Sequence, residues 1–267
     1  MQLKGKCPFC LSDKLKYIVN FENITILGCK SCTNAWTHPP PAKIPYSQMD
    51  FHLDNLQCNN TQIMKNDLTE LPLDWKNAIV QQVKLIQKYV SSGSTILDIG
   101  CGEGILLDQI KKAGFKAQGI EPSESASRRA KEKGLNVVTD CFPSPLVTGI
   151  VDAVIMVQVL EHTADPLDTL IKIADIVPNG YLFLVQTNYK GLVPVLRRNK
   201  WYAWVPDQHF WHFSPKGLEY ICKEAGFEKV DLEYSTLVHK SPCIRQLTRM
   251  IPLLGDQFHL VLKRSQK

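Results

Sequence analysis

The sequence predicts an α/β fold built on a doubly wound, mostly parallel sheet, with a small separate unit at the N-terminus. From residue 95 onward, apolar strand patterns alternate with helical patterns, which indicates repeated βα units. The last two strand patterns follow each other with no long helical pattern between them, so an antiparallel edge is expected. Four cysteines near the start of the chain mark the N-terminal unit.

The composition is that of a globular protein of 267 residues, 44% hydrophobic and 21% charged, with a net charge of +5. This mild basicity permits phosphorylated or nucleic-acid partners but requires neither. The N-terminus has no apolar stretch of the secretory type, and the apolar run GIVDAVIMVQVL is too short to cross a bilayer. We therefore expect a soluble, cytoplasmic protein without a membrane span, whose nine cysteines do not form a disulfide framework.

The N-terminal cysteines follow the pattern C-x2-C-x18-C-x2-C, with Cys7, Cys10, Cys29 and Cys32. Each C-x2-C pair can wrap a tight turn around one metal ion, and two pairs complete a tetrahedral zinc site. Between the pairs, KYIVNF and TILGC have the pattern of two strands joined by a short turn. The sequence thus predicts a zinc ribbon over residues 1–40 with a structural Zn²⁺. A redox pairing of the cysteines is the less favoured alternative.

A proline-rich stretch, THPPPAKIPYSQ, indicates a stiff connector after the ribbon. We place a linker and cap segment over residues 41–72 and the main domain over residues 73–267. At the start of the main domain, apolar residues recur at helical spacing from Asp74 to Val90. This pattern predicts a helix packed on the main sheet.

The main domain then shows strand and helix patterns in turn. Strands are predicted at TILDI, KAQGIE, NVVTD, VDAVIMVQVL and GYLFLVQT, and later at EKVDLEYST and FHLVLKR. Helices are predicted at EGILLDQIKKAG, SESASRRAKEKG, DPLDTLIKIADIV and SPKGLEYICKEAG. The last helix has Ser214 as its N-cap, Pro215 at its first position and Gly226 at its end.

A glycine-rich loop, GCGEG, follows the first strand of the main domain. Gly100, Gly102 and Gly104 let the backbone pass close to a ligand, as in loops that hold nucleotide phosphates. The carboxylates of Asp98 and Glu103 lie beside this loop in the sequence and would repel a doubly charged anion. The G-x-G-x-G pattern also departs from the G-x-G-x-x-G of dinucleotide-binding loops. A ligand with an amino group, a positive centre and a small carboxylate fits better, and S-adenosylmethionine has all three.

Two further acids fit this ligand. Glu121 ends the second strand, where a carboxylate can accept hydrogen bonds from both ribose hydroxyls. Asp140 ends the third strand, where it can accept from the adenine amine, with Cys141 beside the ring. Open α/β sheets bind ligands at the carboxyl ends of their strands. An acid at a strand end is more often a helix N-cap or a solvated loop residue, so the prediction depends on the combination.

With LDIGCGEG, Glu121, Asp140 and QVLEH at residues 158–162, the sequence resembles the class I S-adenosylmethionine-dependent methyltransferases, and in particular the branch that includes ubiquinone-biosynthesis O-methyltransferases. The resemblance implies a seven-stranded sheet in the order 3-2-1-4-5-7-6. It also implies that residues of the glycine loop and the strand ends contact the cofactor: Asp98, Gly100, Cys101, Gly102, Gly104, Glu121, Pro122, Asp140, Cys141, Gln158 and Val159.

Two regions are candidates for the acceptor site. His162, just past the fourth strand, is a candidate base, although Glu161 and His162 can equally cap the following loop. The insert over residues 188–213 is too long and aromatic for a simple connector, and it carries His209 and His212 as further candidate bases. We predict that its aromatic side chains shape the acceptor pocket; the alternative is that they only cover the core. The four candidates are Tyr189, Trp201, Trp204 and Trp211.

The predicted function is S-adenosylmethionine-dependent methyl transfer to an oxygen or nitrogen of a small molecule, sugar or glycan precursor. Three basic residues of the insert, Arg197, Arg198 and Lys200, either meet an anionic acceptor or are solvated. One alternative is RNA methylation, because zinc-ribbon guanine methyltransferases of ribosomal RNA resemble this chain in length and domain order. Those enzymes typically use one ribbon histidine and lack this combination of E-H and H-F-S-P. A second alternative is a non-catalytic scaffold that binds S-adenosylmethionine.

Overall fold

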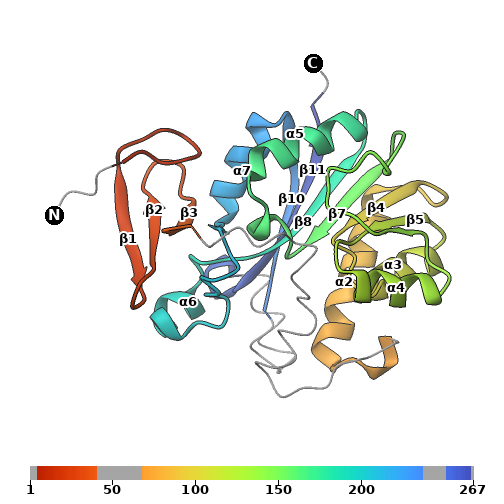
Figure 1. The fold of residues 1–267 in the computed structure, drawn as a ribbon, viewed down its shortest axis with the longest axis horizontal. Coiled ribbons are helices and arrows are strands. Elements are labelled where there is room, and N and C mark those ends of the chain that lie inside the picture. Colours follow the sequence, from red (N-terminus) through yellow and green to blue (C-terminus); the bar gives the residue numbers. More distant parts are fainter. Residues whose placement is uncertain (1–4, 41–67, 237–250, 266–267) are drawn as a thin grey trace. The chain divides into compact units, whose positions relative to one another are not determined.

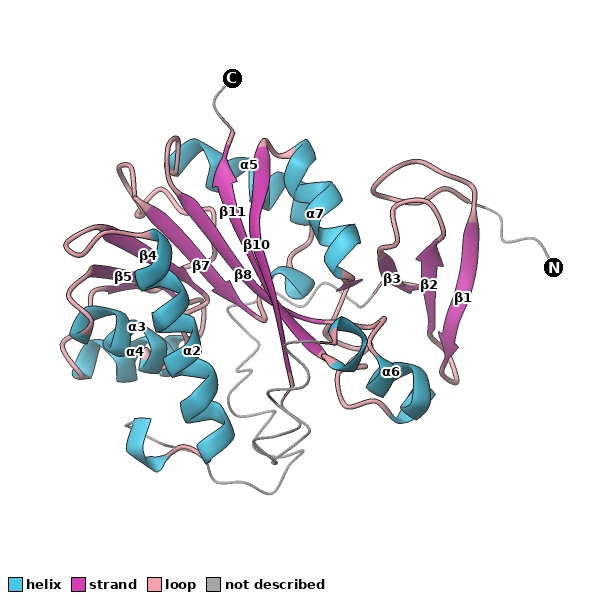
Figure 2. Cartoon of the chain, turned by 180° about the vertical axis from the view of Figure 1, so that it is seen from behind, coloured by secondary structure: helices cyan, strands magenta, loops and turns pink. Residues whose placement is uncertain are grey.

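The computed structural model describes residues 5–40, 68–236 and 251–265. The chain divides into two compact units, each made of separate segments. The first unit takes residues 1–42, 158–174 and 184–267, and the second takes residues 43–157 and 175–183. Most of the expected linker and cap segment lies outside the described residues, so the domain boundaries stay predictions. Figures 1 and 2 show the chain from opposite sides.

The second unit holds the parallel strands that the βα pattern predicts. Its strands are β4 (Thr95–Ile99), β5 (Lys116–Ile120), β6 (Val137–Val138) and β7 (Ala153–Val157). Strand β4 pairs in parallel with β5 and with β7, and β5 pairs in parallel with β6. The helices are α2 (Leu73–Tyr89), α3 (Ile105–Lys112) and α4 (Glu124–Glu132), and the short 3-10 helix η2 (Leu68–Glu70) precedes α2.

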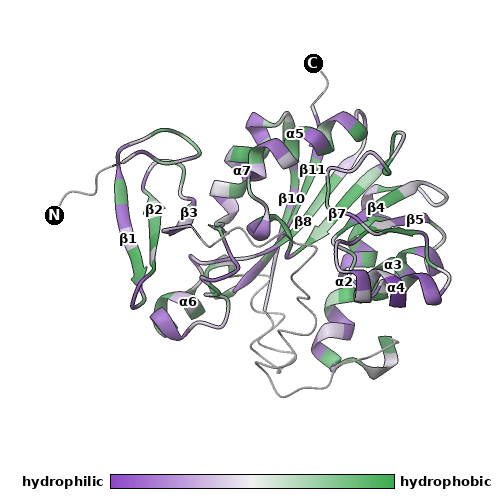
Figure 3. Cartoon of the chain, viewed as in Figure 1, coloured by the Kyte–Doolittle hydropathy of each residue, from purple (hydrophilic) through white to green (hydrophobic). Residues whose placement is uncertain are grey.

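Local chemistry explains where these elements begin and how tightly they pack. Strand β7 is a continuous apolar run, seen as a green ribbon in Figure 3. Strand β4 is apolar except for Thr95 and Asp98, and Ile96 of β4 and Val154 of β7 are fully buried. Helix α4 begins at Ser123, whose side chain accepts a hydrogen bond from the Ala126 N–H. A side chain at Gly104, which has a φ of 77°, would collide with Leu135. Glycine there lets helix α3 begin close to the end of helix α4.

The first unit contains a four-stranded antiparallel sheet and the strands and helices of the C-terminal half. The four strands are β1 (Leu15–Asn20), β2 (Thr25–Cys29), β3 (Ala35–His38) and β9 (Trp211–His212), in the order β1-β2-β3-β9. The remaining strands are β8 (Tyr181–Thr187), whose first three residues belong to the second unit, β10 (Phe227–Ser235) and β11 (Gln257–Arg264). The helices are η3 (Leu160–His162), α5 (Pro166–Ile176), α6 (Leu192–Arg197), η4 (Arg198–Lys200), α7 (Pro215–Glu224) and η5 (Pro252–Leu254).

The seven main strands form one sheet in the order β10-β11-β8-β7-β4-β5-β6. Counted along the main domain, this is the order 3-2-1-4-5-7-6 that the resemblance implies, and the fold class is confirmed. Strands β10 and β11 are antiparallel, which confirms the expected antiparallel edge. No helix in the described residues is long and apolar enough to cross a membrane.

Pairing between the ribbon and the aromatic insert was not predicted. Strand β3 pairs with β9 of the insert, Ala35 opposite His212 and Trp36 opposite Trp211. The side chains of Ile26 and Ala35 in the ribbon form one buried cluster with Tyr189, Trp201 and Trp204 of the insert. The ribbon and the insert are therefore parts of one packed structure.

Candidate functional site

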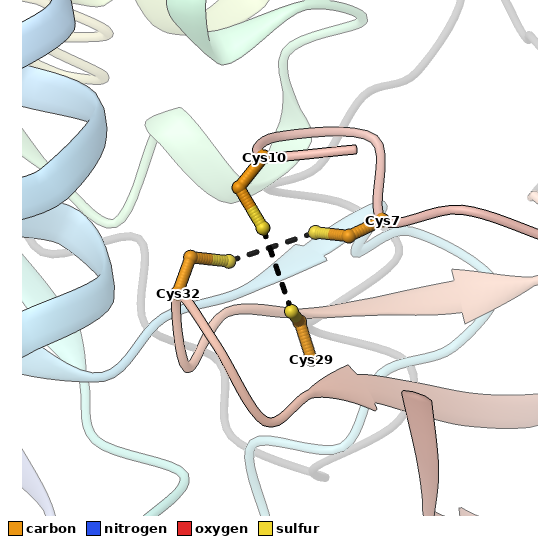
Figure 4. A group of neighbouring side chains, drawn as sticks. All are labelled: Cys7, Cys10, Cys29 and Cys32. Carbon is orange, nitrogen blue, oxygen red and sulfur yellow. Dashed lines mark hydrogen bonds between the residues drawn. The ribbon is translucent and has the colours of Figure 1, made fainter. Parts of the chain in front are cut away.

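The four predicted zinc ligands converge at one end of the ribbon (Figure 4), and their sulfurs lie within 4.8 Å of one another. The Cys7 and Cys32 sulfurs are 3.5 Å apart, and those of Cys10 and Cys29 are 3.6 Å apart. Zinc–sulfur bonds of about 2.3 Å in a tetrahedron place the sulfurs about 3.8 Å apart, whereas a disulfide needs about 2 Å. The geometry therefore suits one tetrahedral metal ion.

The turns around this cluster have the backbone that such a site requires. Leu11 and Thr33 each follow the second cysteine of a pair and have left-handed φ values of 57° and 65°. The hydrogen bond from Cys32 lowers the pKa of the Cys7 thiol to about 5, so one thiolate forms readily. A bound Zn²⁺ would keep all four sulfurs deprotonated and would tie both turns together.

The glycine loop in the second unit is tied to the ends of two strands. The N–H groups of Gly100 and Cys101 both donate to the Ile120 carbonyl at the end of β5. The Glu121 carboxylate accepts from the Gly102 N–H at 2.8 Å and from the Ser123 N–H at 2.9 Å. Glu121 therefore fixes the loop and the start of α4 together, in addition to its predicted ribose contact.

Asp98 is buried at the end of β4, with 2% of its surface exposed. Burial raises the pKa of its carboxyl to about 8, and the nearby charge of Glu121 contributes to the same shift. A buried carboxyl in this state favours a cationic partner. The resemblance assigns Asp98 to the methionine moiety of S-adenosylmethionine, which carries such a cation in its ammonium group.

Two acids of this region have local partners that sequence reasoning missed. Glu103 forms a salt bridge with Arg129 of α4, with the Oε1 and Nε atoms 2.9 Å apart, so it does not leave an uncompensated charge in the loop. Asp140 accepts from the Cys141 N–H at 2.8 Å and from the Ser144 hydroxyl at 2.6 Å. Its adenine contact stays a prediction.

Gln158 begins the loop after β7 in a conformation that glycine usually occupies, with a φ of 55°. With its amide oriented to satisfy its neighbours, the nitrogen donates to Glu161 Oε1 at 2.9 Å and the oxygen accepts from the Thr187 N–H at 3.3 Å. Glu161 Oε2 has no hydrogen-bond partner in the described residues. Burial raises the pKa of the Glu161 carboxyl to about 7.

Two further residues of the predicted cofactor site are half-buried. Val159, which follows Gln158, lies at the start of η3, and Pro122 lies after β5.

His162 and His209, predicted as candidate bases, lie against each other in the first unit. Their rings meet edge to face with centroids 4.6 Å apart. Burial lowers the pKa of His162 to about 4, and it lowers that of His209 well below its usual value, with the charges of His162 and His212 contributing. His162 Nδ1 lies 3.1 Å from the Gln208 carbonyl, so in the neutral ring Nδ1 carries the proton and Nε2 the lone pair.

Ligand atoms of Glu161, His162 and His209 lie within 4.8 Å of one another. Two imidazoles and a carboxylate are a donor set that divalent transition metals accept. The same groups can alternatively exchange a proton, because the imidazoles are neutral near pH 7 and the carboxyl titrates there.

His212 is held differently from the other two histidines. The Thr37 hydroxyl donates its only proton to the His209 carbonyl at 2.6 Å. Because that proton is used, the Thr37 hydroxyl oxygen accepts a hydrogen bond from His212 Nε2–H at 3.1 Å. Nε2 of His212 is thus the protonated nitrogen, and burial lowers the pKa of this ring to about 3. Thr37, at the end of the ribbon, was not singled out in the sequence, because its partners are more than 170 residues away.

The four predicted acceptor aromatics have different environments. Trp201 is 2% exposed in the cluster shared with the ribbon. Trp211 donates from Nε1 to the Thr163 carbonyl at 2.7 Å and meets Phe9 edge to face. Tyr189 and Trp204 line a cavity beside β1. Acceptor roles for all four stay predictions.

Comparison with known proteins agrees with this geometry. A family model described as a methyltransferase domain matches residues 75–232. The ubiquinone biosynthesis O-methyltransferase of Coxiella burnetii (strain Dugway 5J108-111) is 27% identical over 72% of this chain and 83% of its own. The protein of the same name from Aromatoleum aromaticum is 30% identical, over 62% of this chain and 74% of its own.

Solved structures share the fold. Magnesium protoporphyrin IX methyltransferase from Synechocystis PCC 6803 with bound SAH superposes with a TM-score of 0.57, at 16% identity over 72% of this chain and 84% of that chain. The CcbJ methyltransferase from Streptomyces caelestis gives a TM-score of 0.56, at 13% identity over 74% of this chain and 95% of that chain. From its motif, its sheet order and the matching family model, the chain belongs to the methyltransferase-domain family and is a class I S-adenosylmethionine-dependent methyltransferase.

Proposed function

We propose that the protein methylates an oxygen or nitrogen of a small molecule, sugar or glycan precursor. The observation that supports this proposal is the group formed by Glu161, His162 and His209, which puts neutral imidazoles beside a carboxyl that titrates near pH 7. A hydroxyl or amine acceptor must lose one proton when it gains a methyl group, and such a group can accept it. The names of the relatives point to small hydroxylated acceptors in those proteins.

S-adenosylmethionine supplies the methyl group on a positively charged sulfur. In the proposed reaction, the acceptor oxygen or nitrogen forms a bond to the methyl carbon while the carbon–sulfur bond breaks and its electron pair stays on sulfur. The acceptor's proton passes to Nε2 of His162 or to its neighbour His209. One positive charge disappears from sulfur as another forms on the imidazole. The net charge of the site is therefore the same before and after methyl transfer, although the imidazolium is buried. Glu161 can then take the proton, since its pKa of about 7 exceeds that of His162.

The same proposal assigns Asp98 to the methionine ammonium group, Glu121 to the ribose hydroxyls and one Zn²⁺ to the ribbon cysteines. The zinc has a structural role in this proposal, because it would hold the turns from which β2 and β3 extend. Elemental analysis of the purified chain is expected to give one zinc per molecule.

The test measures cofactor binding and turnover separately. Calorimetry with S-adenosylmethionine should show binding, and Glu121→Ala should weaken it by about 10- to 150-fold, the range for a lost hydrogen bond to a charged group. Turnover is followed as S-adenosylhomocysteine released with a panel of hydroxylated and aminated small acceptors. In that assay His162→Asn should lower kcat while leaving the cofactor Kd unchanged.

Glu132→Ala is the matched control for Glu121→Ala, because Glu132 is an exposed acid on α4 of the same unit. It should bind the cofactor as the unmodified chain does. Methylation of RNA without methylation of any small acceptor would contradict the proposal. Cofactor binding without turnover on either class would favour the scaffold alternative.

A further inference from the structure

A cavity of about 700 Å³ lies beside strand β1 in the first unit, at the seam between the ribbon and the insert. Five consecutive residues of the ribbon, 16–20, line it from one side, and residues between Tyr189 and Trp204 line it from the other. Its volume is in the range of sites for small organic ligands. Nothing in the cofactor motif or the histidine group uses it.

The wall of this cavity is positively charged. Lys16, Lys190 and Arg198 line it, and none of them has a carboxylate partner within the described part of the chain. Partial burial lowers the pKa of Lys190, and the positive charges of Lys16 and Lys216 lower it further, against an opposing effect of Cys32. Neighbouring cations that repel one another in this way are stabilised by a bound anion.

The remaining wall can hold an organic ligand in a fixed position. Tyr189 is anchored because its hydroxyl donates to the Thr33 carbonyl at 2.7 Å, and Trp204 because its Nε1 donates to the Arg198 carbonyl at 2.8 Å. Arg198 itself has a left-handed φ of 49°, so its backbone is held in a conformation that this residue type rarely adopts. The amide side chains of Asn20 and Asn199 add hydrogen-bonding groups.

Strand β1 adds backbone groups to this wall. It is the outermost strand of the four-stranded sheet, so within the described residues its outer edge has no neighbouring strand. An extended ligand can therefore meet cationic side chains, fixed aromatic edges and backbone donors in the same cavity.

We propose that this cavity binds the phosphate-bearing end of a small organic acceptor, with Lys16, Lys190 and Arg198 as its anion contacts. The inference rests on the proposed small-molecule methyl transfer and specifies its substrate class. Three cations within one pocket match the multiple charge of a phosphate or diphosphate better than a single carboxylate. The three cations line a single cavity that is open to solvent and not a long track of charge along a surface, which favours a small ligand over RNA.

The experiment uses the whole 267-residue chain and calorimetry with four probes: uridine diphosphate, inorganic pyrophosphate, uridine and a single-stranded RNA oligonucleotide. Uridine diphosphate and pyrophosphate should bind, uridine should bind at least tenfold more weakly than its diphosphate, and added salt should weaken binding of the charged probes. Lys190→Ala and Arg198→Ala should each weaken uridine diphosphate binding about tenfold or more. Cofactor affinity should be unchanged in both variants.

Lys223→Ala is the matched control, because Lys223 is an exposed lysine on α7 of the same unit and does not line the cavity. Its affinity for uridine diphosphate should equal that of the unmodified chain. Absence of uridine diphosphate binding, or equal binding in all three variants, would overturn the inference, as would binding of the RNA alone. Failure of the proposed function is a separate result, since it shows as absent cofactor binding or absent S-adenosylhomocysteine release.

Discussion

Asp98 carries a carboxyl that the folded protein keeps protonated near neutral pH, because burial raises its pKa to about 8. Its neighbour Glu121 accepts hydrogen bonds from two backbone N–H groups. A cationic ligand beside Asp98 would favour the ionised form of the Asp98 carboxyl.

We predict that binding of S-adenosylmethionine at pH 7 releases most of one proton from Asp98. The carboxyl is mainly protonated at pH 7 in the cofactor-free protein and ionises when the ligand's ammonium group lies beside it. Calorimetry in buffers of different ionisation enthalpy measures the released proton. Asp98→Asn should abolish the release and weaken binding, and an unchanged proton count in that variant would contradict the assignment.

Among single residues, the sequence allowed prediction of those whose neighbours in the fold are also near them along the chain. The glycine loop and the strand-end acids are recognisable because their spacing along the chain sets their spacing in the fold. The partner of Glu103 was missed, because Arg129 lies 26 residues away on another helix. The contacts of Thr37 and the place of Lys16 in the cavity wall were also missed, since only the folded chain brings these residues to the insert.

Among the elements, the ribbon strand β3 has the most unexpected partner. It pairs with β9, and Thr37 on β3 links the His209 carbonyl to the His212 ring. The ribbon thus supports the loop that carries two candidate bases.

Strands β1, β2 and β4 were predicted because each shows several alternating or apolar residues. Strand β9 has two residues and α6 has six, and such short elements leave no periodic pattern in a sequence.

Thr37→Val removes the hydroxyl while keeping the shape of the side chain, and it should lower kcat about tenfold with the cofactor Kd unchanged. The His212 N–H and the His209 carbonyl lose their shared partner, so the loop is no longer held in one position. Turnover and calorimetry on the same preparation separate the two effects. Thr37→Ser keeps the hydroxyl and should restore kcat. Equal loss in both variants would mean that packing alone is affected.

On the scale of the whole molecule, the buried carboxyls and the buried histidines change stability with pH in opposite directions. Asp98 and Glu161 have raised pKa values of about 8 and about 7, so the folded state binds more protons than the unfolded state above pH 4. Their contribution to stability falls as pH rises toward 8. The buried histidines have lowered pKa values, so their contribution falls as pH drops below about 6.5.

The cofactor-free protein should therefore lose thermal stability as the pH rises from 7 to 8, where ionisation of the two carboxyls outweighs the remaining deprotonation of the histidines in the unfolded state. Thermal unfolding monitored by fluorescence at constant zinc concentration measures Tm across this range. Saturating S-adenosylmethionine should reduce the loss, because it offsets the cost of ionising Asp98. A Tm that rises steadily over this range, with or without the ligand, would contradict the pKa assignments.

The position of β11 in the sheet has a consequence for synthesis. In the sheet order, β11 lies between β8 and β10, although it is the last strand along the chain. On the ribosome, the β1–β2 hairpin can form early, because its contacts are local. Strand β3 can pair with β2 early, but its other edge must wait for residue 211 of β9, and within the described residues β10 has no neighbouring strand until residue 257 has left the exit tunnel. Nascent chains shorter than this expose an incomplete sheet, which is the stage at which chaperones would bind them.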